Sequence, residues 1–489
     1  MDYDVMIVGA GLSGIGAAVH LMRDCPGRTF TILEGRDRIG GTWDLFRYPG
    51  IRSDSDMYTL GYRFKPWRAN KAIAGGASIR QYIAETAKEH DVEKHIRFGH
   101  KIKSASFDSS TARWTVMAET ADGAQVTFTC NFLYMCAGYY SYEGGYKPEW
   151  QGEADFGGQI IHPQFWPEDL DYTGKKIVVI GSGATAVTIV PEMAKKAAHV
   201  TMLQRSPTWM VSRPSSDAIA NLLQAVLPAR IAYDLIRWKN VKFGQWFYRQ
   251  TREKPAEVNE NILKRVEKLL PEGTDISHFR PRYNVWDQRL CLVPDADFFQ
   301  ALGKGKASVV TDEIVRFTPS GIELRSGETL EADIIVAATG LKLQALGGIS
   351  LSVDGRPVRI ADKLAYKGLM LSGVPNLAMS LGYINASWTL RSDLIAEYVC
   401  RLLNHMKRTG SEIATPTPGP DVEPERLAWD LSSGYVQRGA DAMPRSGNRP
   451  PWQVTAIIKD DRAILQQGRL DDDMVFSRAG AKAMAEAAE

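Results

Sequence analysis

The sequence predicts an α/β fold made of two dinucleotide-binding, Rossmann-like domains, with a helical insertion in the second. Apolar runs at residues 5–8 and 176–180 each lead into a glycine-rich turn, as the first strand of such a domain does. Helical patterns between residues 215 and 278 then interrupt the alternation of strands and helices. We therefore expect the first domain at 1–145, the second at 146–212, the insertion at 213–285, the rest of the second domain at 286–340, and a return to the first domain with a C-terminal tail at 341–489. The tail, rich in proline and charge beyond Ser411, is expected to wrap the surface.

Composition predicts a globular protein. Of 489 residues, 44% are hydrophobic and 24% are charged, which suffices for large cores. A net charge of +2 gives no general field for nucleic acid. The five cysteines form no C-x-x-C pair and no zinc-ligand spacing, so we expect no metal site and a reducing, cytoplasmic compartment. We expect neither a signal peptide nor a membrane-spanning helix, because the chain shows no basic leader and no long uninterrupted apolar run.

The first glycine-rich turn, Gly9 to Gly14, is expected to bind a dinucleotide pyrophosphate. Gly9 permits a tight turn, Gly11 lets the pyrophosphate approach the backbone, and Gly14 lets the next helix pack on the strand. Ser13 lies in the same turn. The following strand ends in Glu34, whose carboxylate would bind a ribose 2′-hydroxyl and repel a 2′-phosphate. The alternative is an ordinary glycine turn.

Residues 40–54 form a second motif, dense in glycine, proline and large aromatic side chains. This composition predicts a long shaped loop. Such a loop can lay backbone amides and the indole of Trp43 against a flavin ring. The alternative is that Trp43 and Tyr48 are simply core aromatics.

The second glycine-rich turn, Gly181 to Ala186, leads to a strand with a different ending. That strand ends in Gln204-Arg205-Ser206, so that no acidic residue occupies the place of Glu34. A guanidinium and a hydroxyl suit a 2′-phosphate, which predicts a preference for NADPH over NADH. Pro191 should kink or shorten the intervening helix. Arg205 as an ordinary surface arginine is the alternative.

Residues 156–167 join the two nucleotide-binding parts with the pattern F-x-G-x-x-x-H-x-x-x-W-P. Its aromatics and prolines predict a packed connection rather than a flexible linker. By itself, His162 would be a hydrogen-bonded structural residue.

Both this pattern and G-G-x-W-x-x-x-x-Y-P-G-x-x-x-D at 40–54 are complete, and the chain resembles the type I Baeyer–Villiger monooxygenases over almost its whole length. The resemblance implies FAD in the first domain and NADPH in the second. It implies that one oxygen atom of O2 is inserted next to a ketone carbonyl, through a flavin C4a-peroxide, to give an ester or lactone. Thioethers and thioamides would be oxidised at sulfur as a side activity. The lack of a redox dithiol also leaves oxygen as the common acceptor for a reduced flavin.

The resemblance further implies roles for individual residues. Arg289 would be catalytic, stabilising negative charge, and Asp54 would orient it; without the family, Arg289 is a structural ion-pair residue. His162 and Trp166 would couple the domains, and Trp388 would line the substrate pocket. The FAD contacts would be Gly9, Gly11, Ser13, Gly14, Glu34, Gly41, Thr42, Trp43, Asp44, Leu45, Asp54, Ile102 and Asn385, and the NADPH contacts Gly181, Ser182, Gly183, Ala184, Thr185, Ala186, Arg205 and Ser206. Gln288 stands where many relatives carry a lysine, so NADPH preference rests more heavily on Arg205.

Three alternatives stay open. The enzyme could be a flavin monooxygenase limited to N- and S-oxygenation, or the chain could be an FAD-binding sensor or scaffold without turnover. The insertion carries thirteen Lys/Arg against eight Asp/Glu from residue 228 to 289, with aromatics between them. This pattern favours a solvated helical cap over a peripheral membrane or hydrophobic-substrate surface.

Overall fold

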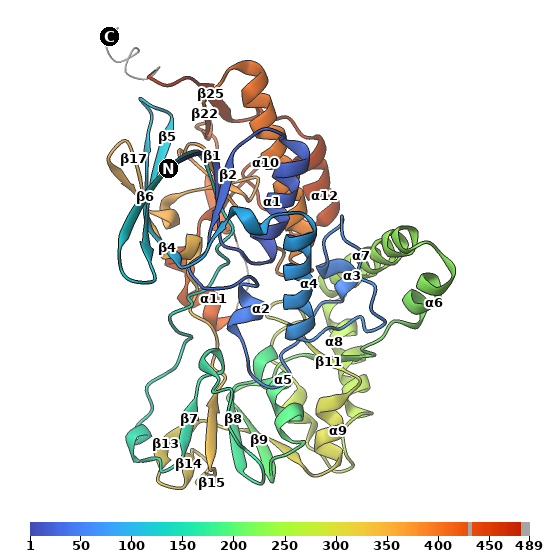
Figure 1. Ribbon diagram of the computed structural model, residues 1–489. Helices are drawn as coiled ribbons and strands as arrows, with labels where there is room; N and C mark the ends of the chain where they lie inside the picture. Colours follow the sequence, from blue (N-terminus) through green and yellow to red (C-terminus); the bar gives the residue numbers. More distant parts are fainter. Residues whose placement is uncertain (429–432, 481–489) are drawn as a thin grey trace.

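Two sheets organise the protein, one in each half of the computed structural model, which describes residues 1–428 and 433–480 (Figure 1). Each sheet receives a strand, a glycine-rich turn and a helix in succession, which confirms the predicted α/β class with two Rossmann-like domains. Residues 429–432 and 481–489, within the segment predicted to return to the first domain and form the tail, lie outside the described residues.

The sheet of the first domain combines a parallel core with an antiparallel meander. Strand β1 pairs in parallel with β2 and β6, and β21 joins β6 in parallel, whereas β4, β5 and β6 pair antiparallel. In spatial order the strands are β18 (Arg356–Val358), β17 (Ser350–Val353), β4 (His100–Asp108), β5 (Arg113–Thr120), β6 (Gln125–Met135), β1 (Asp2–Val8), β2 (Phe30–Leu33) and β3 (Ile96–Arg97), with β21 (Leu377–Met379) beside β6.

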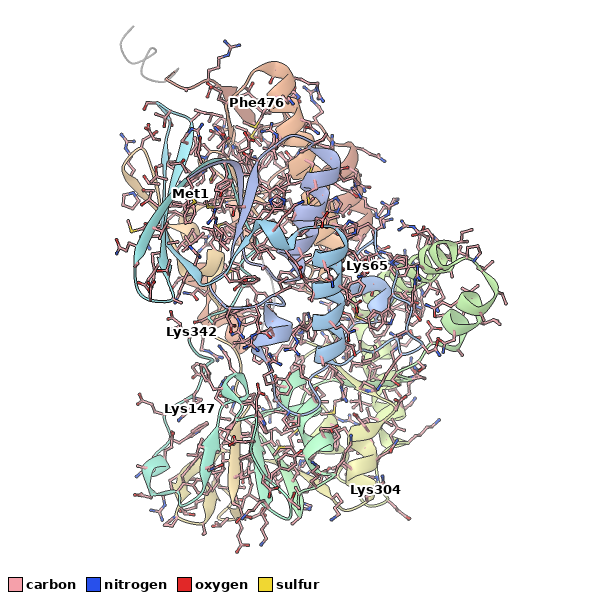
Figure 2. The ribbon with its side chains drawn as sticks, viewed as in Figure 1. Met1, Lys65, Lys147, Lys304, Lys342 and Phe476 are labelled. Atoms are coloured by element: carbon pink, nitrogen blue, oxygen red, sulfur yellow. The ribbon has the colours of Figure 1, made fainter. Side chains whose placement is uncertain are left out.

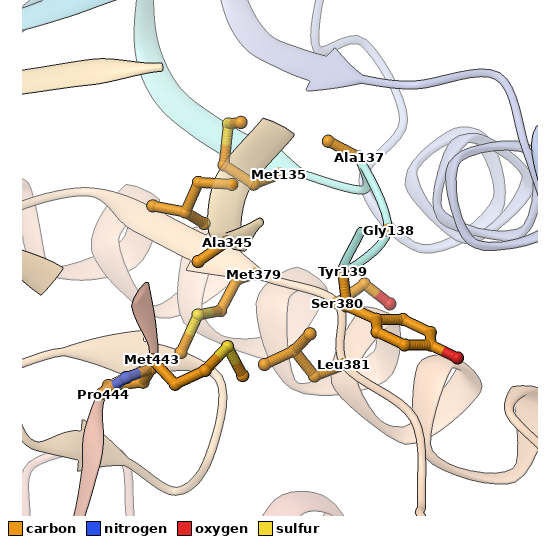
Figure 3. Close-up of a pocket in the computed structure, with 11 residues that line it drawn as sticks. Met135, Ala137, Gly138, Tyr139, Ala345, Met379, Ser380, Leu381, Met443 and Pro444 are labelled. Carbon is orange, nitrogen blue, oxygen red and sulfur yellow. The ribbon is translucent and has the colours of Figure 1, made fainter. Parts of the chain in front are cut away.

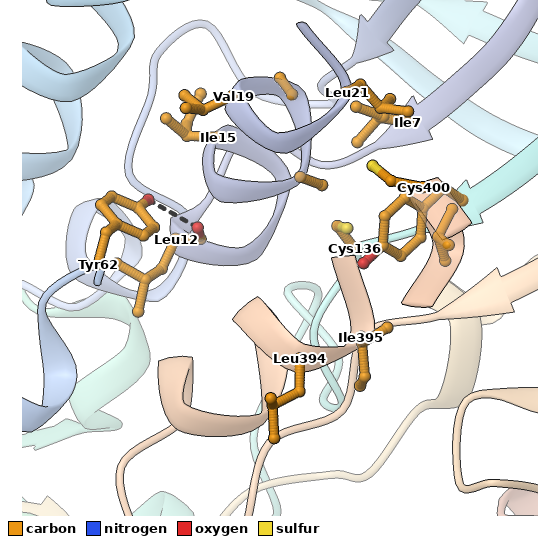
Figure 4. Close-up of a cluster of buried hydrophobic side chains, with 14 of the residues drawn as sticks. Ile7, Leu12, Ile15, Val19, Leu21, Tyr62, Cys136, Leu394, Ile395 and Cys400 are labelled. Atoms are coloured by element: carbon orange, nitrogen blue, oxygen red, sulfur yellow. Dashed lines mark hydrogen bonds between the residues drawn. The ribbon is translucent and has the colours of Figure 1, made fainter. Parts of the chain in front are cut away.

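Helices α1 (Leu12–Asp24), α4 (Gly76–Glu89) and α10 (Thr389–Thr409) cover one face of this sheet. Helix α1 is buried along almost its whole length, because it is covered by β1 on one side and α10 on the other. Figure 4 shows this core, in which the hydroxyl of Tyr62 donates a hydrogen bond of 2.7 Å to the carbonyl oxygen of Leu12. Helices α1 and α10, from the N-terminal and C-terminal parts of the first domain, thus pack together although they are nearly 400 residues apart in sequence.

The sheet of the second domain is parallel throughout. Its order is β12 (Ala307–Thr311), β9 (His199–Gln204), β8 (Lys176–Ile180), β16 (Ile334–Ala337) and β7 (Gln159–Ile161). Helices α5 (Ala184–Met193) and α9 (Asp297–Gly303) pack against each other on this domain. Pro191 lies inside α5, which ends two residues later, as its sequence predicted.

The insertion folds into α6 (Ala218–Val226), α7 (Ala229–Glu253) and α8 (Pro255–Glu267). The insertion interrupts the sequence of the second domain. Tyr233 and Ile236 of α7 nevertheless lie in the hydrophobic core of the first domain. Ile262 and Val266 of α8 lie in the core of the second. The insertion therefore bridges both domains, which its position in the sequence did not reveal.

Two antiparallel connections cross between the domains and hydrogen-bond to each other. The amide of Ser141 donates to the carbonyl of Lys342 at 2.8 Å, and the amide of Tyr146 donates to that of Gly340 at 2.9 Å. Lys342 is labelled between the two halves in Figure 2.

Shorter elements complete the fold. They are α2 (Thr42–Leu45), α3 (Met57–Leu60), α11 (Gly434–Arg438), α12 (Ile458–Arg462), the paired strands β10 (Met210–Arg213) and β11 (Cys291–Pro294), β19 (Ala365–Tyr366) and β20 (Met370–Leu371), β22 (Ile413–Pro416) and β25 (Met474–Ser477), β23 (Pro424–Leu427) and β24 (Arg445–Gly447), and the hairpins of β13 (Ile314–Thr318), β14 (Gly321–Leu324) and β15 (Thr329–Glu331).

The expectation that the tail beyond Ser411 wraps the surface is wrong for part of the tail. Trp452 and Leu465 are fully buried in the first core, because apolar anchors lie between its prolines and charges.

Within residues 1–428 and 433–480, no three His, Cys, Asp or Glu side chains are placed to hold a metal ion. In the same ranges, every helix is too short or too polar to cross a membrane.

Candidate active site

The first glycine-rich turn lies where β1 meets α1, close to the end of β6. Gly9 has a φ of +100°, and a Cβ there would lie 2.6 Å from the carbonyl oxygen of Cys136. A Cβ on Gly14 would lie 1.8 Å from the carbonyl oxygen of Gly9, so only glycine lets α1 pack this close to the turn. Gly11 is the N-cap of α1 and has no side chain to cap the helix amides. Those amides are available to an anionic group.

The second motif folds back onto this turn. The amide of Gly40 donates to the carbonyl oxygen of Ala10 at 3.1 Å. A Cβ on Gly41 would lie 3.0 Å from the Cα of Gly11, so the two motifs meet backbone to backbone. This close approach explains the pair of glycines that opens the motif.

Helix α2 continues the second motif and touches both domains. The hydroxyl of Tyr140 lies 2.6 Å from Thr42 Oγ1. Trp43 packs against the core of the first domain, whereas Leu45 is buried in the core of the second. Tyr140 is a contact that sequence reasoning missed. The aromatic run after Gly138 was the signal for it.

Asp44 is fully buried and surrounded by arginines. Its carboxylate lies 2.5 Å from Arg36 Nη2, 2.5 Å from Arg47 Nη2 and 3.1 Å from Arg80 Nη1. The charge of Arg36 also acts on Glu34, so three guanidiniums face two carboxylates and leave a small net positive charge beside the glycine-rich turn. Nothing in the sequence connected Arg80 with this site, because it comes from α4.

Glu34 and Ile102 follow or lie on strands that are not adjacent in the first sheet, β2 and β4, yet their backbones approach each other. Glu34 is buried, and its carboxylate accepts hydrogen bonds from the amides of Ala10 at 2.7 Å and Arg36 at 2.9 Å. Burial raises the pKa of Glu34 above its ordinary value. The amide of His100 donates to the carbonyl of Glu34 at 2.9 Å, and the β4–β5 register is irregular just after Ile102. The backbone beside Ile102 therefore lies close to the Glu34 end of β2.

Trp388 stands against the first glycine-rich turn. Its indole Nε1 donates to Ser13 Oγ at 2.7 Å, and its ring stacks on Tyr139 with centroids 5.3 Å apart. Asn385 Nδ2 donates to the carbonyl of Ala456 at 3.3 Å. Both predicted residues thus belong to one loop between β21 and α10.

The second glycine-rich turn repeats the geometry of the first. Gly181 has a φ of +131°, and a Cβ there would lie 2.3 Å from the carbonyl oxygen of Ala338, at the end of β16. A Cβ on Gly183 would meet nothing within 4 Å, so the turn has open space beside it. Ala184 begins α5, and Ala186 is buried at the place that Gly14 holds in α1.

The residues predicted to bind a 2′-phosphate lie beside this turn. Ser182 Oγ donates to the carbonyl of Ser206 at 2.9 Å. Arg205 and Ser206 are exposed at the end of β9. The structure therefore brings the turn and the Arg205–Ser206 pair together.

The end of the second motif reaches across to the second domain. The hydroxyl of Tyr48 hydrogen-bonds to the side chain of Thr185, and burial raises the pKa of Tyr48 well above its usual range. Gly50, with a φ of +76°, packs against α5. Arg52 forms an ion pair with Asp297 at the start of α9. One loop thus contacts both glycine-rich turns.

Asp54, at the end of this loop, lies close enough to Arg289 for the two charges to interact. Burial raises the pKa of Asp54, and the positive charges of Arg289 and Arg52 oppose that rise. Burial likewise raises the pKa of Cys291 to about 12, and the nearby Asp54 charge adds to it. Arg289 is exposed and Asp54 is half-buried. The carboxylate and the guanidinium are 235 positions apart in sequence, so only the fold makes them neighbours.

The joining stretch 156–167 forms the edge strand β7 and then reaches the connections. His162 Nδ1 accepts from the amide of Gln164 at 3.2 Å. A Cβ on Gly145 would lie 2.3 Å from His162 Nε2 and 3.0 Å from the carbonyl of Gly340, so the ring packs on both connections. Burial lowers the pKa of His162. Trp166 is buried in the second core.

A pocket of about 400 Å³ opens between the insertion and the first domain. It is lined by Tyr248 and Arg252 of α7, by Trp286 and Asp287 near Arg289, and by Gly382, Tyr383, Ile384, Arg391, Arg426, Ala428, Val454, Thr455 and Ala456. Sequence reasoning assigned none of these to a site, because they come from segments far apart in the chain. A smaller, mainly apolar cavity of about 10 Å³ lies at the ends of β6 and β21 (Figure 3).

Known proteins are similar to this chain in sequence and in fold. A family model described as flavin-binding monooxygenase-like matches residues 73–269, and one for an NAD(P)-binding Rossmann-like domain matches residues 7–66. The chain is 52% identical to the FAD-containing monooxygenase EthA of Mycobacterium tuberculosis over 473 residues, 96% of each chain. It is 48% identical to the probable FAD-binding monooxygenase AlmA of an Acinetobacter species, over 98% of this chain and 97% of the relative.

Among solved structures, the fold is similar to that of an oxidised steroid monooxygenase bound to NADP. The TM-score is 0.78 with 22% identity, over 98% of this chain and 100% of the other. This likeness concerns the fold, whereas the identities near 50% over nearly the full length establish the family. The chain belongs to the FAD-containing, flavin-binding monooxygenases.

Proposed function

We propose that the protein is an NADPH-dependent Baeyer–Villiger monooxygenase, which converts a ketone and O2 into an ester or lactone and oxidises thioethers and thioamides at sulfur as a side activity. The observation that carries the proposal is the position of Arg289, whose charge acts on Asp54 at the end of the loop that contacts both glycine-rich turns. A guanidinium at that place can stabilise negative charge that develops during the reaction.

The residues of the first domain fit FAD. The uncapped amides of α1 and the close backbones of Gly11 and Gly41 form a cradle that side chains would fill. The positive charge around Asp44 complements a pyrophosphate, and the buried Glu34 suits a ribose hydroxyl. The half-buried Trp43 packs beside the turn.

The residues of the second domain fit NADPH. Open space beside Gly183 leaves room for a pyrophosphate at the start of α5. Arg205 and Ser206 offer a cation and a hydroxyl at the end of β9, in the place that the acidic Glu34 holds in the first domain.

In the proposed reaction, the cofactor supplies the oxygen chemistry and the protein stabilises the charge that develops. Reduced FAD, when bound, supplies activated oxygen. Arg289 stabilises negative charge that develops on the ketone oxygen, and Asp54 holds the guanidinium in place. Bound nicotinamide and substrate would cover the exposed Arg289 and exclude water, which strengthens its electrostatic effect. The 400 Å³ pocket beside Trp286 is the proposed substrate site.

A substrate panel tests the reaction class. Purified enzyme with NADPH and air should convert aliphatic, cyclic or aryl ketones into esters or lactones, identified by mass spectrometry. Thioethers should also give sulfoxides. Sulfoxide formation without any ester, across the whole panel, would establish the narrower N- and S-oxygenating flavin monooxygenase instead.

A second test concerns the reductant. Arg205→Ala should raise the KM for NADPH by roughly tenfold to a hundredfold, because a charge-assisted phosphate contact contributes about 1.5–3 kcal/mol. The KM for NADH should change little. Exposed Arg213→Ala, at the end of β10, serves as the matched control. Equal effects of Arg205→Ala on both cofactors would show that Arg205 does not contact the 2′-phosphate.

A further inference from the structure

The outer face of the insertion is apolar where a solvated cap would be polar. In α6, Ile219, Leu222 and Val226 are 57%, 63% and 65% exposed. In α7, the large exposed apolar side chains are Ile231, Leu235, Trp238, Phe243 and Trp246. We call these eight residues the outer apolar face. Their spacing of mostly three and four places them along one side of each helix.

The inner side of the same helices is already occupied. Ala220 of α6 and Ala232, Tyr233 and Ile236 of α7 are fully buried against the first domain. Packing within the chain therefore accounts for one face of α7 and leaves the other uncovered. Figure 1 shows α6 and the adjoining part of α7 projecting from the body of the molecule. Contiguous exposed apolar residues of this extent are uncommon on a protein that stays in water.

The charge around this face is positive. From Asp217, which caps α6, to Glu253, which ends α7, the chain contains six basic residues, Arg230, Arg237, Lys239, Lys242, Arg249 and Arg252, and three acidic residues, Asp217, Asp234 and Glu253. Arg237 is buried, but Lys242 and Arg249 are exposed between the aromatics. Further cations come from elements packed against the two helices. The guanidinium of Arg213 lies over the ring of Phe243. Arg63 lies beside Arg230, because Arg230 Nη1 donates a hydrogen bond of 2.6 Å to the carbonyl oxygen of Arg63.

We propose that the outer apolar face is a membrane-docking surface that binds bilayers containing anionic phospholipid. Trp and Phe side chains interleaved with Lys and Arg are suited to the boundary between headgroups and acyl chains, where rings bury and cations meet lipid phosphates. Pairing with a second copy fits less well, because a two-fold contact would bring the same cations face to face. The same helix lines the 400 Å³ pocket through Tyr248 and Arg252, so docking would place the pocket near the membrane surface.

Flotation with lipid vesicles tests this surface on the FAD-loaded, full-length protein. Wild type should float with vesicles of phosphatidylcholine and phosphatidylglycerol at low salt, and much less with phosphatidylcholine alone. Trp238→Ser/Trp246→Ser should lower the binding constant for vesicles by roughly tenfold or more. Lys242→Gln/Arg249→Gln should lower it by roughly fivefold per charge at low salt, and added salt should have a similar effect.

The matched control is Val315→Ser/Val475→Ser, which removes two exposed apolar side chains from other elements. It should bind vesicles like wild type. Retained FAD absorbance in every variant shows that the fold is intact. Failure of wild type to float with anionic vesicles, or equal flotation of the tryptophan variant and the control, would overturn the proposal. So would a concentration-dependent dimer, seen by sedimentation, that the tryptophan variant abolishes while vesicle binding is absent.

Discussion

At the scale of single residues, the surroundings of Arg289 determine how strongly its charge interacts with Asp54. An exposed arginine in water interacts weakly with a neighbouring carboxylate. Here Asp54 is half-buried at the meeting point of both domains, where burial raises its pKa and the Arg289 charge lowers it. A shielded carboxylate of this kind can hold a guanidinium in one orientation, which an ion pair on an open surface does not do.

Arg289→Ala tests this arrangement. The folded variant should keep FAD and still be reduced by NADPH, whereas ester formation should fall by roughly a hundredfold or more, as expected for removing one preorganised charge donor. Asp54→Asn should act in the same direction less severely, because it only positions the arginine. Stopped-flow reduction and product yield, each per bound FAD, are the measurements. Undiminished ester yield from Arg289→Ala would refute the catalytic role.

A buried titratable residue links pH to stability. His20 on α1 is 2% exposed. Burial lowers its pKa, but the carboxylates of Asp24 and Asp393, each 3.5 Å from a ring nitrogen, outweigh this and raise the pKa to about 9. The guanidinium of Arg23, whose Nη2 lies 2.9 Å from Nδ1, limits the rise. Because the folded pKa exceeds the ordinary value of 6.5, protonated His20 stabilises the fold.

The stabilisation should be fully present below pH 6.5 and be lost as pH rises through 9, and it should amount to roughly 3 kcal/mol. Melting temperatures of wild type and His20→Gln should therefore differ most at pH 6 and converge above pH 9. A difference that is constant across this range would mean that His20 stays neutral in the folded protein.

At the scale of elements, the buried Arg237 is one of the side chains that hold α7 against the first domain. Arg237 Nη1 donates to the carbonyls of Tyr58 and Gly61 at 2.8 Å each, and its Nη2 lies 3.7 Å from Asp393. The side chain is 8% exposed. It therefore satisfies carbonyls at the end of α3 that water cannot reach.

Arg237→Met should destabilise the protein by roughly 3–5 kcal/mol, because it leaves Asp393 and the α3 carbonyls buried without their cation. Arg249→Met, on the same helix but 64% exposed, should cost no more than about 1 kcal/mol. Thermal unfolding followed by FAD release gives both values. Similar losses for the two variants would show that Arg237 contributes only surface electrostatics.

At the scale of the whole molecule, the two domains are joined in two ways. The connections at Ser141–Lys342 and Tyr146–Gly340 hydrogen-bond to each other, and His162 packs on both of them. The second motif provides another contact through Tyr48 and Arg52. The proposed active site lies where that motif meets the second domain. Any change in the angle between the domains would therefore alter the position of Asp54 relative to Arg289.

The sequence by itself determined the fold class, the two nucleotide turns and the motif loop. These features depend on neighbours along the chain. Gly9, Gly14 and Gly181 are required by backbone contacts within one turn or with the adjacent strand, and such constraints leave a local pattern. The family could be inferred for the same reason, since its motifs are short and contiguous.

Only the tertiary structure decided which distant residues meet. The ion pair of Arg80 with Asp44, the electrostatic interaction of Asp54 with Arg289, the pocket of about 400 Å³ and the burial of Trp452 all join segments that are far apart in sequence. Burial and electrostatics depend on proximity in space, which hydrophobic periodicity does not encode. The insertion shows this most clearly. Its sequence predicted helices and a basic, aromatic surface, but only the packing of α7 on the first domain showed which face is covered and which is exposed.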